Sequence, residues 1–168
     1  YSFLPVFRRH NTQTELQTMT KILQTAAAFL LAAALPAAQA AAGPDKDNYG
    51  SYSGHGGMTA YRIAPEAYRY HYDKGFTGID AMGWNSNLQF AWSRIGAALT
   101  CNIPADTGKL TEKLIAEYGY DVFAHRMNGF EFHALQSKGI NGFCTQARIE
   151  EINRLIPEME NGRFEKRF

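Results

Sequence analysis

The chain has 168 residues, a formal net charge of +1 and a charged fraction of 20%. This length accommodates one domain with a substantial core. The near-neutral balance, with no run of basic residues and no long basic amphipathic helix, argues against nucleic acid and membrane surfaces as partners.

The first forty residues have the pattern of an export signal. Met19 is the expected start, and residues 1–18, which lack apolar periodicity, are expected to be an upstream or non-native segment. Residues 19–40 follow the order of a secretory signal peptide: Lys21 in a short positive region, an apolar run of about 14 residues, and a small-residue cleavage site after Ala40. A membrane-spanning helix needs about 20 residues, and no cysteine lies at the cleavage site, so we expect no stable membrane anchor.

Cleavage after Ala40 leaves 128 residues and changes the net charge to −1, because Arg8, Arg9 and Lys21 are removed together with Glu15. The alanine-rich apolar run is typical of bacterial signals. We therefore expect an exported bacterial envelope protein, periplasmic or secreted.

Residues 41–58 are rich in glycine and contain few apolar side chains, so we expect a flexible N-terminal segment. The following stretch, 59–76, is rich in tyrosine. Pro65 and Glu66 favour a short helix there, whereas the alternation from Tyr68 to Tyr72 is equally compatible with a short strand.

Two amphipathic helices are predicted next. In the first, from Asn85 to about Thr100, apolar residues recur at helical spacing. This stripe consists of Leu88, Trp92, Ile95 and Leu99. Asp106 is expected to cap the second helix, which buries Leu110, Leu114, Ile115 and Tyr118. Gly119 is expected to end it.

A third helical segment is expected to begin at Asp121, and a fourth helix to run from about Phe143 to Ile156, where Pro157 ends it. The predicted apolar side of the third segment consists of Val122, Phe123, Met127, Phe130 and Ala134. The inward residues of the fourth are Ala147, Ile149, Ile152 and Ile156. Residues 161–168 are expected to fray. The predicted fold is therefore mainly α: a single-domain bundle of about four short helices over residues 59–160, closed by one disulfide.

That disulfide joins Cys101 and Cys144, because two cysteines in an exported protein most simply pair with each other. Two buried free thiols or a bridge between chains are the alternatives. A loop of this length corresponds to roughly 4 kcal/mol of stabilisation in the chain-entropy model.

Three groups of residues are candidate functional sites. Tyr68, Tyr70 and Tyr72 would form a protein-binding surface if exposed, because tyrosine dominates interface hot spots; aromatic residues at helical spacing are otherwise core. His55 and His71, with His125, are candidate metal ligands, although their spacing matches no closed site.

Asp121 and His125, one helical turn apart, form the third group. This spacing suits a carboxylate that orients an imidazole base, and it equally suits a helix cap beside a solvated histidine. The chain contains no GxSxG, HExxH, Walker or GxGxxG motif. An enzymatic role is therefore disfavoured, and no cofactor beyond a possible metal is indicated.

The run Cys101-Asn102-Ile103-Pro104 before a Leu/Ile helix, and Gly142-Phe143-Cys144 before the last helix, resemble the small periplasmic immunity proteins that neutralise type VI secretion effectors. The resemblance implies a protein partner. The leading hypothesis is a non-enzymatic, inhibitor- or immunity-like binding module. The alternatives are a periplasmic metal-binding protein that uses His55, His71 and His125, and an envelope hydrolase that uses Asp121 and His125.

Overall fold

The computed structural model describes residues 49–60 and 62–168. The expected upstream segment 1–18, the signal peptide 19–40 and the first part of the N-terminal segment, 41–48, lie outside the described residues. The described residues belong to one unit, Ala41–Phe168. Within them, no helix combines the length and the apolar character needed to cross a membrane.

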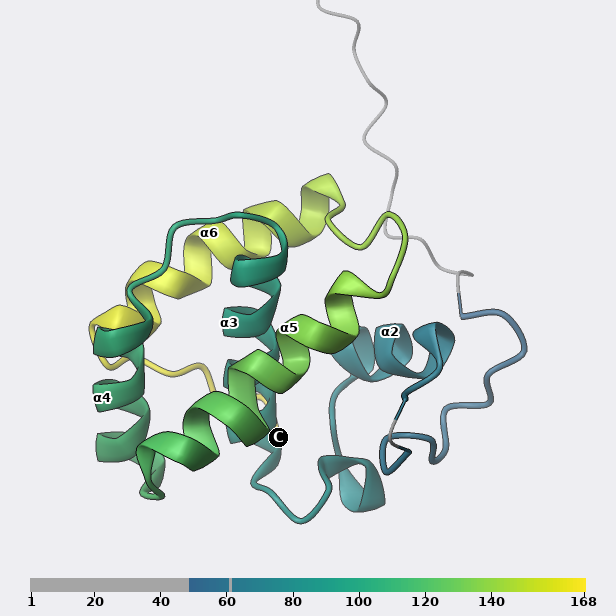
Figure 1. Cartoon of the computed structure of the whole chain (residues 1–168), viewed down its shortest axis with the longest axis horizontal. Coiled ribbons are helices and arrows are strands. Elements are labelled where there is room, and N and C mark those ends of the chain that lie inside the picture. The colour runs from purple at the N-terminus through teal and green to yellow at the C-terminus, as the bar shows by residue number, and fades with distance from the viewer. Residues whose placement is uncertain (1–48, 61) are drawn as a thin grey trace, which may run out of the picture. The chain divides into compact units, whose positions relative to one another are not determined.

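The described part of the chain is helical and contains no strand (Figure 1). The α-helices are α2 (Pro65–Lys74), α3 (Ser86–Thr100), α4 (Thr107–Tyr118), α5 (Glu131–Lys138) and α6 (Gln146–Glu160). A 3-10 turn, η1 (Gly78–Ala81), precedes α3, and a π-helical segment, η2 (Ala124–Phe130), precedes α5. The mainly α prediction is confirmed. The tyrosine-rich stretch forms a helix, with Pro65 in its first turn.

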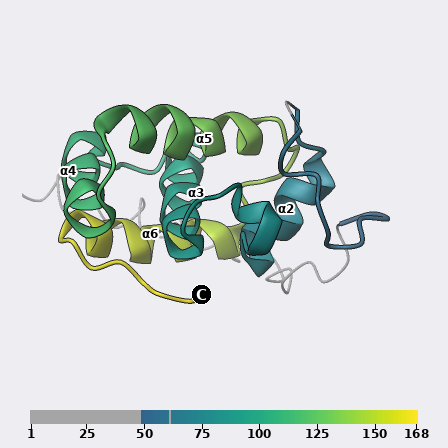
Figure 2. The same ribbon diagram turned by 90° about the horizontal axis from the view of Figure 1, so that it is seen from below.

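Helix α3 is the centre of the fold. Figure 2 shows α5 on one side of it and α6 on the other, and the residues from Asn87 to Ala98 are buried on every face of the helix. A helix that is buried on every face needs neighbours on all sides. Gly96 permits the closest approach, because a Cβ there would lie 2.7 Å from the backbone nitrogen of Ala134 in α5.

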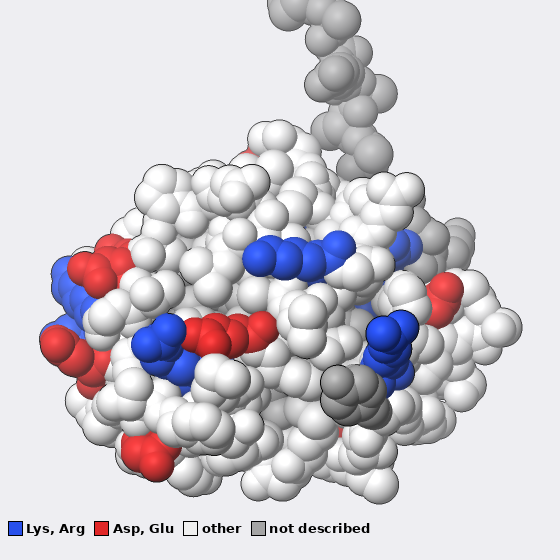
Figure 3. Space-filling view, viewed as in Figure 1, with Lys and Arg blue, Asp and Glu red and all other residues white. Residues whose placement is uncertain are grey.

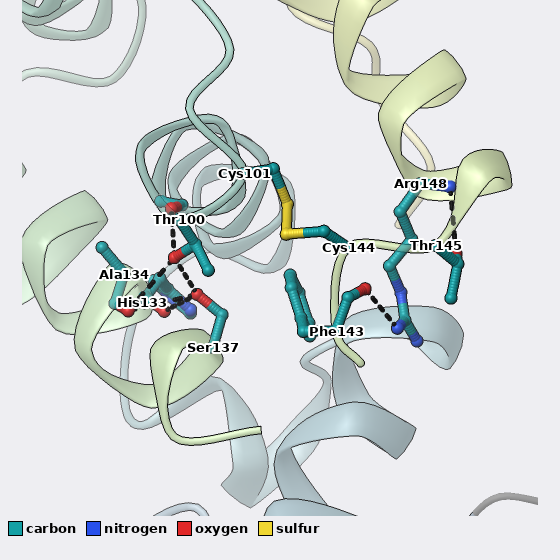
Figure 4. The surroundings of a disulfide bond; sticks show 10 residues. Thr100, Cys101, His133, Ala134, Ser137, Phe143, Cys144, Thr145 and Arg148 are labelled. Atoms are coloured by element: carbon teal, nitrogen blue, oxygen red, sulfur yellow. Dashed lines mark hydrogen bonds between the residues drawn. A yellow bond between two sulfur atoms is a disulfide. The ribbon is translucent and has the colours of Figure 1, made fainter. Parts of the chain in front are cut away.

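The predicted disulfide between Cys101 and Cys144 is confirmed, with the two Cα atoms 5.6 Å apart. It joins the end of α3 to the segment before α6, beside a hydrogen-bonded pair of hydroxyls, Thr100 and Ser137, whose oxygens are 2.6 Å apart (Figure 4). The bond therefore fixes α6 against the central helix.

The segment after Asp121 differs from the predicted helix. Its first turns form η2, in which backbone hydrogen bonds span five residues instead of four. A wider turn shifts side chains four apart off a common face, and the backbone kinks at Gly129 (φ −95°, ψ −115°). Phe130 and Ala134 are buried as expected. Val122, Phe123 and Met127 are exposed, so their assignment to the core is wrong.

Pro157 does not end the last helix, which continues to Glu160. The additional turn is stabilised by burial of Met159, which is fully inaccessible, while the proline lies on the exposed side. Helix propensity at one position is outweighed by this packing.

The C-terminal residues 161–168, expected to fray, contact the bundle. The side-chain oxygen of Asn87 accepts hydrogen bonds from the backbone nitrogens of Arg167 (2.7 Å) and Phe168 (3.0 Å). The ring of Phe168 lies against that of Phe90. A buried asparagine side chain needs hydrogen-bond partners, and the backbone of the C-terminal residues supplies them.

Residues 49–58 also contact the bundle, in contrast to the flexibility expected for the N-terminal segment. Met58 is buried, and the rings of Tyr49 and Tyr52 pack edge-on against Tyr70. The Tyr49 hydroxyl donates a hydrogen bond to Asp73 over 2.9 Å. The high glycine content of this segment suggested flexibility, but its aromatic residues make contacts that hold it against the bundle.

Candidate functional site

The tyrosines predicted as an exposed surface do not form one. Tyr68 and Tyr72 are each 1% exposed, and Tyr70 is half-buried. In a helix, residues four apart share a face, so Tyr68 and Tyr72 both point into the core while Tyr70 lies on another side. The expectation of an exposed tyrosine patch is therefore wrong, because the helical conformation of α2 places two of the three tyrosines on its inward face.

The two buried tyrosines have different polar surroundings. The Tyr68 hydroxyl lies 3.0 Å from Nδ1 of His133 and donates to the backbone oxygen of the same residue over 3.2 Å. The Tyr72 hydroxyl has no hydrogen-bond partner among the described residues. Its ring lies under the Arg94 guanidinium, 3.9 Å from the ring centroid. Burial raises the pKa of Tyr72 to about 12.

The three candidate metal ligands are not brought together. His55 is exposed. His71 is buried, with Nδ1 3.2 Å from the Gly75 carbonyl oxygen and Nε2 2.7 Å from the Tyr52 hydroxyl. In the described ranges, no group of three histidine, cysteine, aspartate or glutamate side chains is arranged to hold a metal. The geometry therefore gives no support to a site built from these histidines.

Asp121 and His125 do not form an acid–base pair. The Asp121 carboxylate accepts a hydrogen bond from the Ala124 backbone nitrogen over 2.8 Å, as a cap does. The His125 ring is buried; its Nδ1 accepts from the Trp92 indole over 3.1 Å, and its Nε2 lies 2.6 Å from the Gly119 carbonyl oxygen. Burial lowers the pKa of His125, which keeps the ring neutral. Both ring nitrogens are engaged, so neither is placed to accept a substrate proton.

His125 instead fixes the conformation of η2. It connects the first turn of this segment to Trp92 in α3 and to Gly119 at the end of α4. The Trp92 ring also fills the space beside Gly129, where a Cβ would lie 2.6 Å from the indole. π-Helical turns are rare and recur at functional sites, which directs attention to the side chains that η2 displays.

Side chains of η2 and of the residues directly before it form an exposed apolar surface, which we call the η2 face. It comprises Tyr120, Val122, Phe123 and Met127, each at least half exposed, with Phe123 reaching 63%. Beside them lies a shallow hollow of about 340 Å³. Met82, Trp84, Met127, Asn128 and Phe132 line it.

Aromatic rings support this face from beneath. Trp84 packs edge-on against Trp92, with ring centroids 5.1 Å apart, and against Tyr120 at 5.0 Å. Tyr120 has a left-handed backbone conformation (φ 65°), which is uncommon for a residue with a side chain. The rings are therefore held by the core on one side while remaining partly open to solvent on the other.

The η2 face has little net charge. Two charged side chains of opposite sign lie within its range of the chain, the exposed Asp121 and Arg126. Arg126 pairs with Glu131 through two hydrogen bonds, Nε to Oε1 at 3.0 Å and Nη2 to Oε1 at 2.8 Å. Figure 3, viewed as in Figure 1, where α5 lies in front of α3, shows charged side chains in separate groups with uncharged surface between them.

The sequence pattern did not indicate this site. On a regular helix the apolar residues at 123, 127 and 130 share one face, which predicts a buried stripe, and Gly129 alone interrupts the run. No protein family, curated protein or solved structure matches the chain.

Proposed function

We propose that this chain is an exported envelope protein that acts by binding another protein through the η2 face, without catalysis. The observation that carries the proposal is the exposed cluster of Tyr120, Val122, Phe123 and Met127 on a conformationally fixed segment. A disulfide between Cys101 and Cys144 is compatible with an oxidising compartment outside the cytoplasm.

A protein partner suits the composition of this face. Aromatic residues and methionine are enriched at the centres of protein interfaces, whereas lysine and glutamate are depleted there. Exposed apolar clusters of this kind on soluble domains mark interaction sites. Since Trp84, Trp92 and His125 hold the segment in place, little conformational entropy is lost when a partner binds.

The metal-binding and hydrolase hypotheses have no comparable support. His55, His71 and His125 lie in separate surroundings, and the ring of His125 is occupied by structural hydrogen bonds.

Site-specific photocrosslinking tests the proposal. A benzophenone amino acid replaces Phe123 in the full chain, expressed with its signal in a bacterial host and irradiated in cells. The control carries the same group at Asn153, which is exposed on α6, on the other side of α3. We expect a discrete protein adduct from position 123 that excess wild-type protein suppresses and Met127→Glu protein does not. Absence of an adduct, or the same adducts from both positions, would overturn the proposal.

A further inference from the structure

The hollow beside η2 has a lining of uniform chemistry. Two thioether side chains, Met82 and Met127, lie with two aromatic rings, Trp84 and Phe132. Asn128 is the single polar side chain in the lining, and none of the five residues is ionisable. The hollow therefore offers dispersion, sulfur–aromatic and ring–ring contacts, together with one hydrogen-bonding amide.

The lining offers no ion-pair partner to a charged occupant. A charged group that enters the hollow loses water and finds no opposite charge in the lining, which is unfavourable. The charges of Arg126 and Glu131, which lie nearby, are already paired with each other. An uncharged occupant meets no such penalty.

The ring geometry favours an aromatic occupant over an aliphatic one. Trp84 already makes edge-to-face contacts with the buried Trp92 and with the exposed Tyr120, and a further ring against Trp84 extends this arrangement. Methionine sulfur makes favourable contacts with aromatic rings, and its flexible chain adapts to their shape. Both thioethers are available for such contacts.

We propose that the hollow receives an uncharged aromatic side chain of the bound protein. This inference rests on the proposed function and adds the chemistry by which the partner is recognised. The inserted ring packs between Met82, Met127 and Trp84, while Asn128 bonds a polar group beside it. Tyr120 and Phe123 then lie at the border of the contact, where they exclude water.

Methyl NMR of the full chain tests the inference, with ¹³C-methyl methionine as the reporter and N-acetyl-tryptophanamide as the probe. The chain provides its own controls, because Met58 and Met159 are buried in the core. We expect the methyl signals of Met82 and Met127 to shift with half-saturation on the order of 1 mM, while those of Met58 and Met159 stay in place. N-acetyl-leucinamide should bind several-fold more weakly, and N-acetyl-lysinamide should cause no shift.

A pair of variants locates the site. Met127→Glu places a charge in the hollow and should weaken binding of the probe at least tenfold, as read from Met82. Leu135→Glu makes the same change at an exposed position of α5 outside the lining and should leave binding unchanged. Unaltered signals of Met58 and Met159 show that each variant is folded.

The inference is overturned if Met82 and Met127 do not respond, or if the leucine or lysine probe binds as well as the tryptophan probe. If the probe fails while the adduct from position 123 persists, the hollow is not the recognition element and the proposed function stands. If the probe binds but no protein adduct forms, the aromatic ligand is not a protein side chain, and both proposals fail in their present form.

Discussion

The tyrosine-rich helix α2 and the segment from Tyr120 to Met127 have similar local composition and opposite exposure. Tyr68 and Tyr72 lie in the core, whereas Phe123 and Met127 face solvent. The backbone geometry of the two segments differs: α2 is a regular helix whose residues four apart share one face, whereas Met127 lies in the wider turn of η2 and Phe123 directly precedes it. Aromatic content alone therefore does not distinguish a core from an interaction surface.

The two segments also use histidine in parallel ways. The His133 ring lies within hydrogen-bond distance of the Tyr68 hydroxyl (3.0 Å) and of the Gln89 side-chain oxygen (2.7 Å), which ties α2 and α3 to α5. His125 accepts the Trp92 indole and ties η2 to α3. Both rings are buried and neutral, because burial lowers the pKa of each. Histidine in this fold thus acts as a structural connector at both places.

The largest expected effect is the loss of a ring from α2. Tyr72→Ala removes a fully buried aromatic side chain that also contacts the Arg94 guanidinium, and we expect it to lower the free energy of unfolding by about 3–5 kcal/mol. Urea denaturation followed by circular dichroism measures this. A loss below about 1 kcal/mol would show that the tyrosine helix is not part of the core.

A methyl group at Gly129 should disturb the other segment. Gly129→Ala places a Cβ against the Trp92 ring, which cannot move without breaking its hydrogen bond to His125. We expect about 1–3 kcal/mol of destabilisation, together with altered methyl shifts for Met127. Gly108→Ala, on the exposed side of α4 with its nearest neighbour at 3.4 Å, is the matched control and should be tolerated.

Acid should weaken the connection between α2 and α5. Burial and the nearby Arg94 lower the pKa of His133 from 6.5 to about 3. Below pH 6.5, His133 is therefore protonated in the unfolded chain but remains neutral in the folded chain. The free energy of unfolding decreases as the pH falls from 6.5 towards 3. The loss from this residue is about 2 kcal/mol at pH 5.

Comparison of the wild type with His133→Gln at pH 7 and pH 5 isolates that contribution, because the other titrating groups are shared. The variant should lose less stability on acidification than the wild type. Equal losses in both proteins would show that His133 is not the residue responsible.

Removal of the hydroxyl group should change stability differently at the two buried tyrosines. Tyr68→Phe removes the hydrogen-bond partner of Nδ1 and of the backbone oxygen of His133 and should lower the free energy of unfolding by about 1–2 kcal/mol. Tyr72→Phe removes a hydroxyl that has no partner among the described residues and should be neutral or stabilising. Urea denaturation of both variants measures the two changes in the free energy of unfolding. A larger loss for Tyr72→Phe than for Tyr68→Phe would contradict the hydrogen-bond assignment.

The smallest effect on stability is expected at the centre of the η2 face. Phe123→Ser should change the free energy of unfolding by less than about 0.5 kcal/mol, because the ring is already 63% exposed. In a binding role the same variant should reduce adduct formation by a crosslinker placed at Val122. A large loss of stability would instead assign Phe123 to the core.

Much of the fold follows from local pattern. The stripe from Leu88 to Ile95, the cap at Asp106 and the stop at Gly119 depend on spacing and on backbone chemistry within one turn, and the structure has them as predicted. The pairing of Cys101 with Cys144 follows because two cysteines in one chain leave a single intramolecular choice.

The candidate site could not be obtained in the same way. Met127 is exposed in a π turn that Trp92, from α3, stabilises through its hydrogen bond to His125 and its contact with Gly129. The burial of Tyr68 and Tyr72, and the extension of α6 past Pro157, depend likewise on which neighbours the helices meet.

The sequence by itself determined the helical class, the starts and stops of α3 and α4, and the disulfide, because each depends on residues close in the chain or on simple counting. Only the tertiary structure decided which aromatic residues are core and which are surface. A side chain's exposure is a property of the whole packed arrangement: within η2, Phe130 is buried while Met127 is exposed.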